Sequence, residues 1–279
     1  MLRPCRMSGA RGWLAAMNTV TSADGTPIAY DETGDGAVVV IVNGAMSTAA
    51  DAAGLATALA DAGFRAVTWD RRARGSSGDA RGSTPDREVE DLAAVIDAVG
   101  GDAAVLGHSS GAVLGLVAAA RGVPVRALFL SEPPLHFGED EPADDLAERL
   151  QLSVDEGRLD DAIVTFQLEG VGLPQEMVDG IRASDQFAAL LPLAQSTVYD
   201  TNLTREASTP SPEMLAVGVP VTVLRGAQTF PFLIGSSDRL ADAIDGAELV
   251  VVPESVMHRP DPAATARAVR ERLRDGFYA

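Results

Sequence analysis

The sequence predicts an α/β protein with a doubly wound, mostly parallel sheet. From about residue 37 to residue 131, short β-branched runs alternate with Ala- and Leu-rich helical patterns. Such alternation implies right-handed crossovers, which place helices on both faces of a parallel sheet. The run Ala37–Val42 (AVVVIV) is apolar throughout, as a strand buried on both faces requires.

Periodicity and turn residues predict the individual elements. The dipeptide Asp24-Gly25 indicates a hairpin turn between the first two strands. The predicted strands are 19–22, 27–30, 37–42, 65–69, 103–106, 125–130, 219–224 and 247–252. The predicted helices are 49–62, 85–99, 110–120, 144–154, 159–169, 238–244 and 262–273.

The alternation of strands and helices stops at Pro133-Pro134 and resumes near residue 213. The intervening residues, here called the helical insertion, carry helical patterns and no obvious strand. Such an insertion predicts a cap over the carboxyl ends of the strands, where open α/β sheets bind ligands. We therefore expect a disordered lead-in at 1–16, a core of 17–135 and 213–279, and a helical cap at 136–212.

Composition excludes several kinds of chemistry. All 22 basic residues are Arg, so Schiff bases, Ser–Lys dyads and Gly-Lys phosphate loops are excluded. Cys5 is the only cysteine, which excludes an internal disulfide and a cysteine cluster that could hold zinc. A His-Glu-x-x-His motif is also missing, so we expect no metal and no cofactor.

The chain is strongly acidic, with a formal net charge of −18. This charge disfavours nucleic acid and anionic membranes as partners. No apolar run reaches the length needed to span a bilayer, which takes about 18 residues or more. We expect a cytoplasmic protein that acts on a small molecule. The sequence does not predict an oligomeric state.

The segment Gly107-His108-Ser109-Ser110-Gly111 is the strongest functional signal. A Gly-x-Ser-x-Gly pattern alone is weak, but here four apolar residues precede it and an Ala/Val/Leu helix follows. In that context the glycines allow a sharp strand-to-helix turn that exposes a strained serine. We predict that Ser109 is a nucleophile. The alternative is a serine that only caps a helix.

A serine nucleophile needs a base, and the chain has three histidines. His108 lies inside the turn and is expected to pack or to line the rim. His136 lies at the entry to the helical insertion, where it is a candidate for the substrate pocket. His258 follows the last predicted strand after a loop over Pro253–Met257. A serine on such a strand-to-helix turn is typically followed along the chain by an acid and then by a histidine, so we predict that His258 is the base.

The base needs a carboxylate that holds its tautomer. Glu132 lies at the carboxyl end of the predicted strand 125–130, the next strand after the Gly107–Gly111 turn. A buried charge at such a position is costly unless it is paired. We predict that Glu132 is this acid; a salt bridge to a loop arginine is the alternative. An acid could also be expected in the loop after the predicted strand 219–224, but the side chain there, Gln228, carries no charge. Asp238 is the fallback.

Backbone N–H groups are expected to stabilise the oxyanion. One should come from Ala45, in the loop after AVVVIV, and the other from Ser110, at the start of the helix. Apolar residues near the carboxyl edge indicate a mostly apolar pocket. The candidates for its lining are Met46, His136, Phe166, Phe187 and Phe230.

Over residues 18–275 the chain resembles the α/β-hydrolase superfamily. The matching pieces are the Asn43-Gly44 turn, the loop Asp70–Gly78, the elbow Gly107–Gly111, Glu132-Pro133-Pro134 and His258. The resemblance implies the α/β-hydrolase fold and catalytic roles for Ser109, Glu132 and His258, with the acid after the sixth strand. Asn43 and Ala73 depart from the family, which usually has His and Gly there.

The sequence thus predicts a serine hydrolase that cleaves a small, mostly apolar ester or lactone through an acyl-enzyme. Two alternatives stay open. The same site could perform another reaction, such as a lyase reaction, C–C bond hydrolysis or a biosynthetic cyclisation. The protein could also be a small-molecule binder without catalytic activity. The substitutions at Asn43 and Gln228 motivate both alternatives.

Overall fold

The computed structural model describes residues 17–276, so the expectation for residues 1–16 lies outside the described residues. Within that span one eight-stranded sheet has the order β1-β2-β4-β3-β5-β6-β7-β8. β1 and β2 pair antiparallel at one edge, and every pair from β4 to β8 is parallel. The predicted α/β class is confirmed. The strands are β1 (Asn18–Thr21), β2 (Pro27–Thr33), β3 (Ala37–Val42), β4 (Phe64–Trp69), β5 (Ala103–His108), β6 (Ala127–Ser131), β7 (Val221–Gln228) and β8 (Glu248–Val256).

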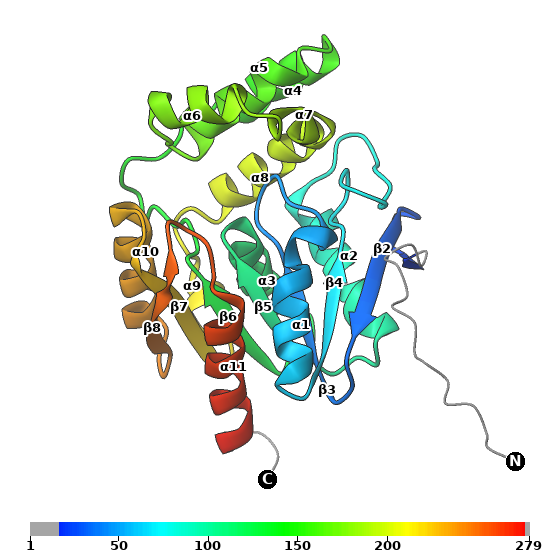
Figure 1. Ribbon diagram of the computed structural model, residues 1–279, viewed down its shortest axis with the longest axis vertical. Coiled ribbons are helices and arrows are strands. Elements are labelled where there is room, and N and C mark those ends of the chain that lie inside the picture. The colour runs from blue at the N-terminus through cyan, green and yellow to red at the C-terminus, as the bar shows by residue number, and fades with distance from the viewer. Residues whose placement is uncertain (1–16, 277–279) are drawn as a thin grey trace, which may run out of the picture.

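Helices cover both faces of the sheet (Figure 1). α2, α3 and α10 contribute to the apolar core on one face, and α1 and α11 to the core on the other. The run in β3 serves both cores, because Val38 and Val40 face one side while Val39 and Ile41 face the other. The helices are α1 (Ala53–Asp61, preceded by the 3-10 turn η1, Ala49–Ala52), α2 (Pro85–Ala98), α3 (Ser110–Ala120), α10 (Pro231–Ala243) and α11 (Pro262–Gly276).

The helical insertion contains helices and no strand between residues 136 and 212, all of which the structure describes. Helix α8 packs against α3 of the core and against α4 and α5 of the insertion. In Figure 1 the helices α4–α7 lie above the sheet, with α8 between them and the core. The elements are α4 (Leu146–Asp155), α5 (Leu159–Thr165), η2 (Phe166–Gly170), α6 (Gln175–Arg182), α7 (Phe187–Leu190), η3 (Leu191–Leu193), α8 (Ala194–Glu206) and α9 (Pro212–Leu215).

The sequence prediction was wrong about the ends of the last two strands. β7 continues to Gln228 and β8 to Val256, and these two residues pair with each other after a bulge. Pro253 was expected in a loop, but it lies inside β8. β8 is an edge strand, where a proline removes no hydrogen bond from the ladder. His258 therefore comes two residues after a strand and does not follow a longer loop.

Two helix boundaries also differ from the prediction. The helix expected at 159–169 ends at Thr165 and continues as the π-helical turn η2 (Phe166–Gly170). Helix α10 was expected from residue 238 but begins at Pro231, at the first helical position where proline is favoured. The helix therefore begins two residues after Thr229, which donates a hydrogen bond to Glu132.

Candidate active site

The turn between β5 and α3 holds Ser109 in a strained conformation, with φ 55° and ψ −127°. Two close backbone approaches surround it. A Cβ at Gly107 would lie 2.4 Å from Gly111 O, and a Cβ at Gly111 would lie 2.1 Å from Val42 O. Only glycine fits at both positions. The two glycines therefore allow the tight turn that places Ser109 between β5 and α3, at the carboxyl edge of the sheet. Strain of this kind costs about 1–3 kcal/mol and is common at active sites.

Glu132 follows β6 directly and is 3% exposed. Its Oε1 accepts a hydrogen bond from Gly226 N (2.8 Å) and its Oε2 accepts one from Thr229 Oγ1 (3.0 Å). Oε2 also lies 2.5 Å from His258 Nδ1. Burial acts to raise the pKa of Glu132, but hydrogen bonds from His258, Gly226 and Thr229 outweigh it and lower the pKa below its usual value. The carboxylate is therefore held in its charged form.

His258 uses Nδ1 for this contact, which leaves Nε2 for a second partner. Met257 and His258 both have positive φ angles, 49° and 60°, so the imidazole of His258 extends from a tight turn. The ring lies 4.5 Å from that of His108, centroid to centroid, at an angle of 40°. Because His108 directly precedes Ser109, this contact places the imidazole beside the elbow. The carboxylate, the imidazole and the serine turn thus meet at one edge of the sheet.

His108, the residue before Ser109, packs its ring against that of His258. Burial and the neighbouring His258 lower the pKa of His108 to about 3, so its ring is neutral at physiological pH. Its Nε2 is buried and has no hydrogen-bond partner among the described residues. The packing role expected for His108 agrees with this environment.

The turn after β3 lies directly against the elbow. A Cβ at Gly44 would come within 2.8 Å of Ser109 Cβ, so glycine allows the two turns to touch. Asn43, which stands where the family usually has histidine, donates from Nδ2 to Thr48 O at 2.6 Å and closes this loop. Ala45 follows, and Ser110 is the first residue of α3, where the N–H has no partner within the helix. Both predicted oxyanion donors therefore belong to adjoining turns.

The pocket candidates divide into two groups. Met46, Phe166 and Phe187 belong to one apolar cluster that also includes Ala45 and connects the insertion to the turn after β3. His136 and Phe230 are not among the members of that cluster. The ring of His136 packs against Phe232, 4.5 Å between centroids, and Phe230 is the half-buried residue that precedes α10.

Asp238, the fallback acid, is bound elsewhere. It lies on α10 and accepts a hydrogen bond from Arg225 Nε at 2.6 Å. Thr229, which follows Gln228, was not among the predicted site residues. Thr229 supplies a hydrogen bond to Glu132 and thereby supports the acid.

A group of buried polar residues that was not predicted from the sequence lies beside the turns. Arg71, Arg74, Glu88 and Asp200 are each at most 2% exposed and form ion pairs with one another. Gln167, on the π-helical turn, is 1% exposed, and its Oε1 has no hydrogen-bond partner among the described residues. The unusual density of arginines in Asp70–Gly78 was a signal for the first group. No signal in the sequence marked Gln167.

Of the described residues, His108, Glu132 and His258 are the group with metal-binding atoms close together, all within 4.8 Å. Two imidazoles and a carboxylate are donors that zinc accepts. Glu132 Oε2 and His258 Nδ1 are hydrogen-bonded to each other, so both atoms already have a partner in this structure.

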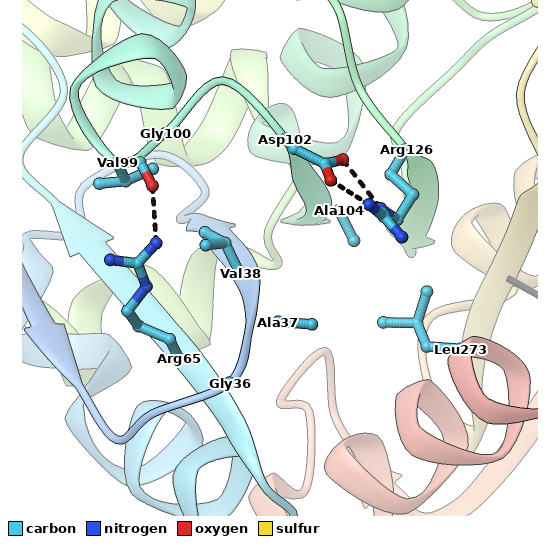
Figure 2. Close-up of a pocket in the computed structure, with 10 residues that line it drawn as sticks. All are labelled: Gly36, Ala37, Val38, Arg65, Val99, Gly100, Asp102, Ala104, Arg126 and Leu273. Atoms are coloured by element: carbon cyan, nitrogen blue, oxygen red, sulfur yellow. Dashed lines mark hydrogen bonds and ion pairs between the residues drawn. The ribbon is translucent and has the colours of Figure 1, made fainter. Parts of the chain in front are cut away.

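A hollow of about 350 Å³ lies at the opposite edge of the sheet (Figure 2). It is lined by residues at the amino ends of β3, β4, β5 and β6. Its two arginines are engaged, since Arg65 donates to Val99 O at 2.7 Å and Arg126 is paired with Asp102. It contains none of the predicted site residues and is distant from their edge of the sheet.

Comparison with known proteins agrees with this fold. The chain is 38% identical to an alpha/beta hydrolase of known structure from Sphaerobacter thermophilus, with a TM-score of 0.84. That alignment covers 91% of this chain and 99% of the other. The chain belongs to the α/β-hydrolase family. A family model described as serine aminopeptidase S33 matches residues 35–160 of this α/β-hydrolase.

More distant structures share the fold. A thermophilic esterase from Thermogutta terrifontis is 21% identical, with a TM-score of 0.68 and coverage of 93% of this chain and 98% of that one. An enol-lactonase from Burkholderia xenovorans is 20% identical, with a TM-score of 0.66 and coverage of 92% and 98%. Among curated proteins no significant match was found. None of the described helices is long and apolar enough to cross a membrane.

Proposed function

We propose that this α/β-hydrolase cleaves a small, mostly apolar carboxylic ester or lactone with Ser109 as nucleophile. The observation that carries the proposal is the 2.5 Å contact between Glu132 Oε2 and His258 Nδ1 at the edge where Ser109 lies. A carboxylate on Nδ1 selects the tautomer that leaves Nε2 free to accept a proton, and it stabilises the imidazolium that follows.

The first half of the reaction forms an acyl-enzyme. His258 Nε2 takes the proton from Ser109 Oγ, and the oxygen attacks the carbonyl carbon of the substrate. The N–H groups of Ala45 and Ser110 stabilise the resulting oxyanion. When the tetrahedral intermediate collapses, the ester C–O bond breaks and His258 gives its proton to the leaving alkoxide.

The second half returns the enzyme to its starting state. His258 removes a proton from water, which attacks the acyl carbon. The second tetrahedral intermediate then releases the carboxylic acid, and the proton returns to Ser109. With a lactone, the alcohol and the acid leave as one molecule. The protein's own groups supply every proton transfer in this scheme.

The apolar cluster between the insertion and the turn after β3 supports an apolar acyl group. Met46 lies next to the predicted oxyanion donor Ala45, and Phe166 and Phe187 of the insertion pack in the same cluster. We expect the acyl group of a substrate bound at Ser109 to contact these side chains. The fold shared with an esterase and an enol-lactonase supports the same class of substrates.

Turnover of a graded panel tests this function. Purified protein is assayed with p-nitrophenyl esters of increasing acyl length and with simple lactones. We expect hydrolysis with a preference for short or medium acyl chains, lost in Ser109→Ala and retained in the exposed control Ser76→Ala. Absence of hydrolysis across the whole panel would contradict the proposal and favour a different reaction or a binding role.

A further inference from the structure

A buried group of charged residues lies beside the turns that carry the proposed oxyanion donors. Arg71 and Arg74 come from the loop after β4, Glu88 from α2, and Asp200 from α8 of the helical insertion. All four are at most 2% exposed, and their two positive and two negative charges balance. We call this group the buried charge cluster.

Asp200 is the member that connects the others to the elbow. Its Oδ1 accepts hydrogen bonds from Ser110 Oγ at 2.7 Å and from Arg71 Nη1 at 2.9 Å. Its Oδ2 accepts one from Arg74 Nη2 at 2.7 Å. One carboxylate therefore holds the side chain of Ser110 and both arginines.

Arg74 acts on the other oxyanion turn. Its Nη1 donates to Gly44 O at 2.6 Å. The C=O of Gly44 and the N–H of Ala45 belong to one planar peptide group, so a bond that fixes the first also fixes the direction of the second. The guanidinium charge also polarises this peptide and strengthens its N–H as a donor. Arg71 donates to Asn43 O at 3.3 Å and restrains the preceding peptide in the same way.

Stability alone is a weak reason for such a cluster. Taking four charges out of water is costly, and apolar residues of similar size often stabilise a core as well or better. Unlike apolar residues, the cluster makes directional hydrogen bonds. These end on particular backbone and side-chain atoms of both turns and so fix the orientation of the turns.

We propose that Asp200 is a positioning residue for the oxyanion hole. It holds Arg74 on the Gly44–Ala45 peptide and holds Ser110 in the elbow, so that both N–H donors point to the same place. Because Asp200 lies on α8, the helical insertion then helps to orient the oxyanion donors. This inference rests on the proposed function.

A matched pair of variants separates positioning from stability. Asp200→Asn removes the charge that Arg71 and Arg74 share. The control is Asp91→Asn. Asp91 is an equally buried carboxylate on α2, and it accepts two hydrogen bonds of 2.7 Å from Arg72. Arg72 belongs to the same loop as Arg71 and Arg74, but among the described residues this pair makes no hydrogen bond to either oxyanion turn. Both variants should lower the melting temperature. Only Asp200→Asn should lower kcat, by about 10- to 100-fold, with little change in KM.

A boronic acid that forms a tetrahedral adduct with serine gives a second readout. Its affinity should fall in Asp200→Asn by about the same factor as kcat, because both depend on the oxyanion donors. A merely structural role would lower the melting temperature and leave the boronate affinity of the folded protein unchanged.

Ser110→Ala keeps the inference testable if Asp200→Asn does not fold. It removes one hydroxyl from the cluster without removing a charge, and we expect kcat to fall by about 3- to 10-fold. Ser237→Ala is the control, because Ser237 is also buried but lies on α10. A wild-type kcat in Ser110→Ala, or equal kcat values in Asp200→Asn and Asp91→Asn, would overturn the positioning role. Wild-type protein that neither hydrolyses esters nor binds the boronate would instead refute the proposed function.

Discussion

Glu132 Oε2 and His258 Nδ1 lie 2.5 Å apart, although 126 positions separate them in the chain. β6 delivers the carboxylate and the turn after β8 delivers the imidazole. Gly226 N and Thr229 Oγ1 hold the carboxylate from β7 and the loop that follows it. Three neighbouring parts of the sheet therefore fix one carboxylate–imidazole contact.

Glu132→Gln should lower kcat by about 10³- to 10⁴-fold, because an amide can hold the imidazole in the wrong tautomer. Thr229→Val removes one of the hydrogen bonds to the carboxylate and should lower kcat by less than about 10-fold. Ester hydrolysis under saturating substrate measures both. Glu139→Gln, an exposed change on the surface, is the control. A Glu132→Gln enzyme with wild-type kcat would remove Glu132 from the mechanism.

Gly44→Ala should lower kcat by about 100-fold, because the new Cβ would lie 2.8 Å from Ser109 Cβ and displace the nucleophile. Gly54→Ala is the matched control, since its Cβ would meet only Pro262 Cγ, at 3.7 Å. That change lies in α1 and should raise the stability by up to about 1 kcal/mol. Equal kcat values for the two variants would contradict the contact between the turns.

The stability of the protein should depend on pH through His108. Burial and His258 lower the pKa of His108 from 6.5 to about 3. Below pH 6.5 the unfolded chain takes up a proton that the folded one does not, so the free energy of unfolding falls as the pH falls towards 3. Above pH 6.5 the contribution of His108 is fully present.

His108→Asn removes this term. In urea titrations from about pH 4 to pH 8, the variant should lose up to about 1.4 kcal/mol less per pH unit than wild type on the acid side. Since carboxylates titrate in both proteins, the difference between the two curves is the measured quantity. Curves that stay parallel through the acid range would show that His108 is protonated in the folded state.

Gln167→Met should raise the free energy of unfolding by about 1 kcal/mol. Gln167 is 1% exposed, its Oε1 has no partner among the described residues, and its Nε2 reaches only Met46 Sδ at 4.0 Å. Methionine has a similar volume and lacks the polar amide. Urea unfolding measures the effect. A destabilisation of similar size would show that the amide makes a hydrogen bond in solution.

The sequence predicts the sheet well, because its signals are local. The AVVVIV run and the Gly107–Gly111 turn each carry their structure within a few residues, and β3, β5 and α3 appear where expected. The last strands were less well predicted because Pro253 and Gly226 usually mark loops. Here Pro253 lies on an edge strand and Gly226 next to a bulge, where both are tolerated.

The partners within the site are less predictable, because they depend on contacts between distant residues. Chain order and the cost of burying a charge predicted Glu132 and His258 as partners, and the structure places the two side chains in contact. No sequence pattern distinguishes Asp200 from the other polar residues of α8. Only the folded structure shows that it contacts Arg71, Arg74 and Ser110. These contacts form only when α8 and the loop after β4 fold together, so no local pattern in the sequence predicts them.

Labelling with a fluorophosphonate tests the central claim most directly, because the probe reacts with serines that a base has activated. Intact-mass and peptide analysis should show one adduct per chain, located on Ser109, absent in Ser109→Ala and formed much more slowly in His258→Asn. Folded wild-type protein that stays unlabelled, or that carries its adduct on a different serine, would contradict the claim.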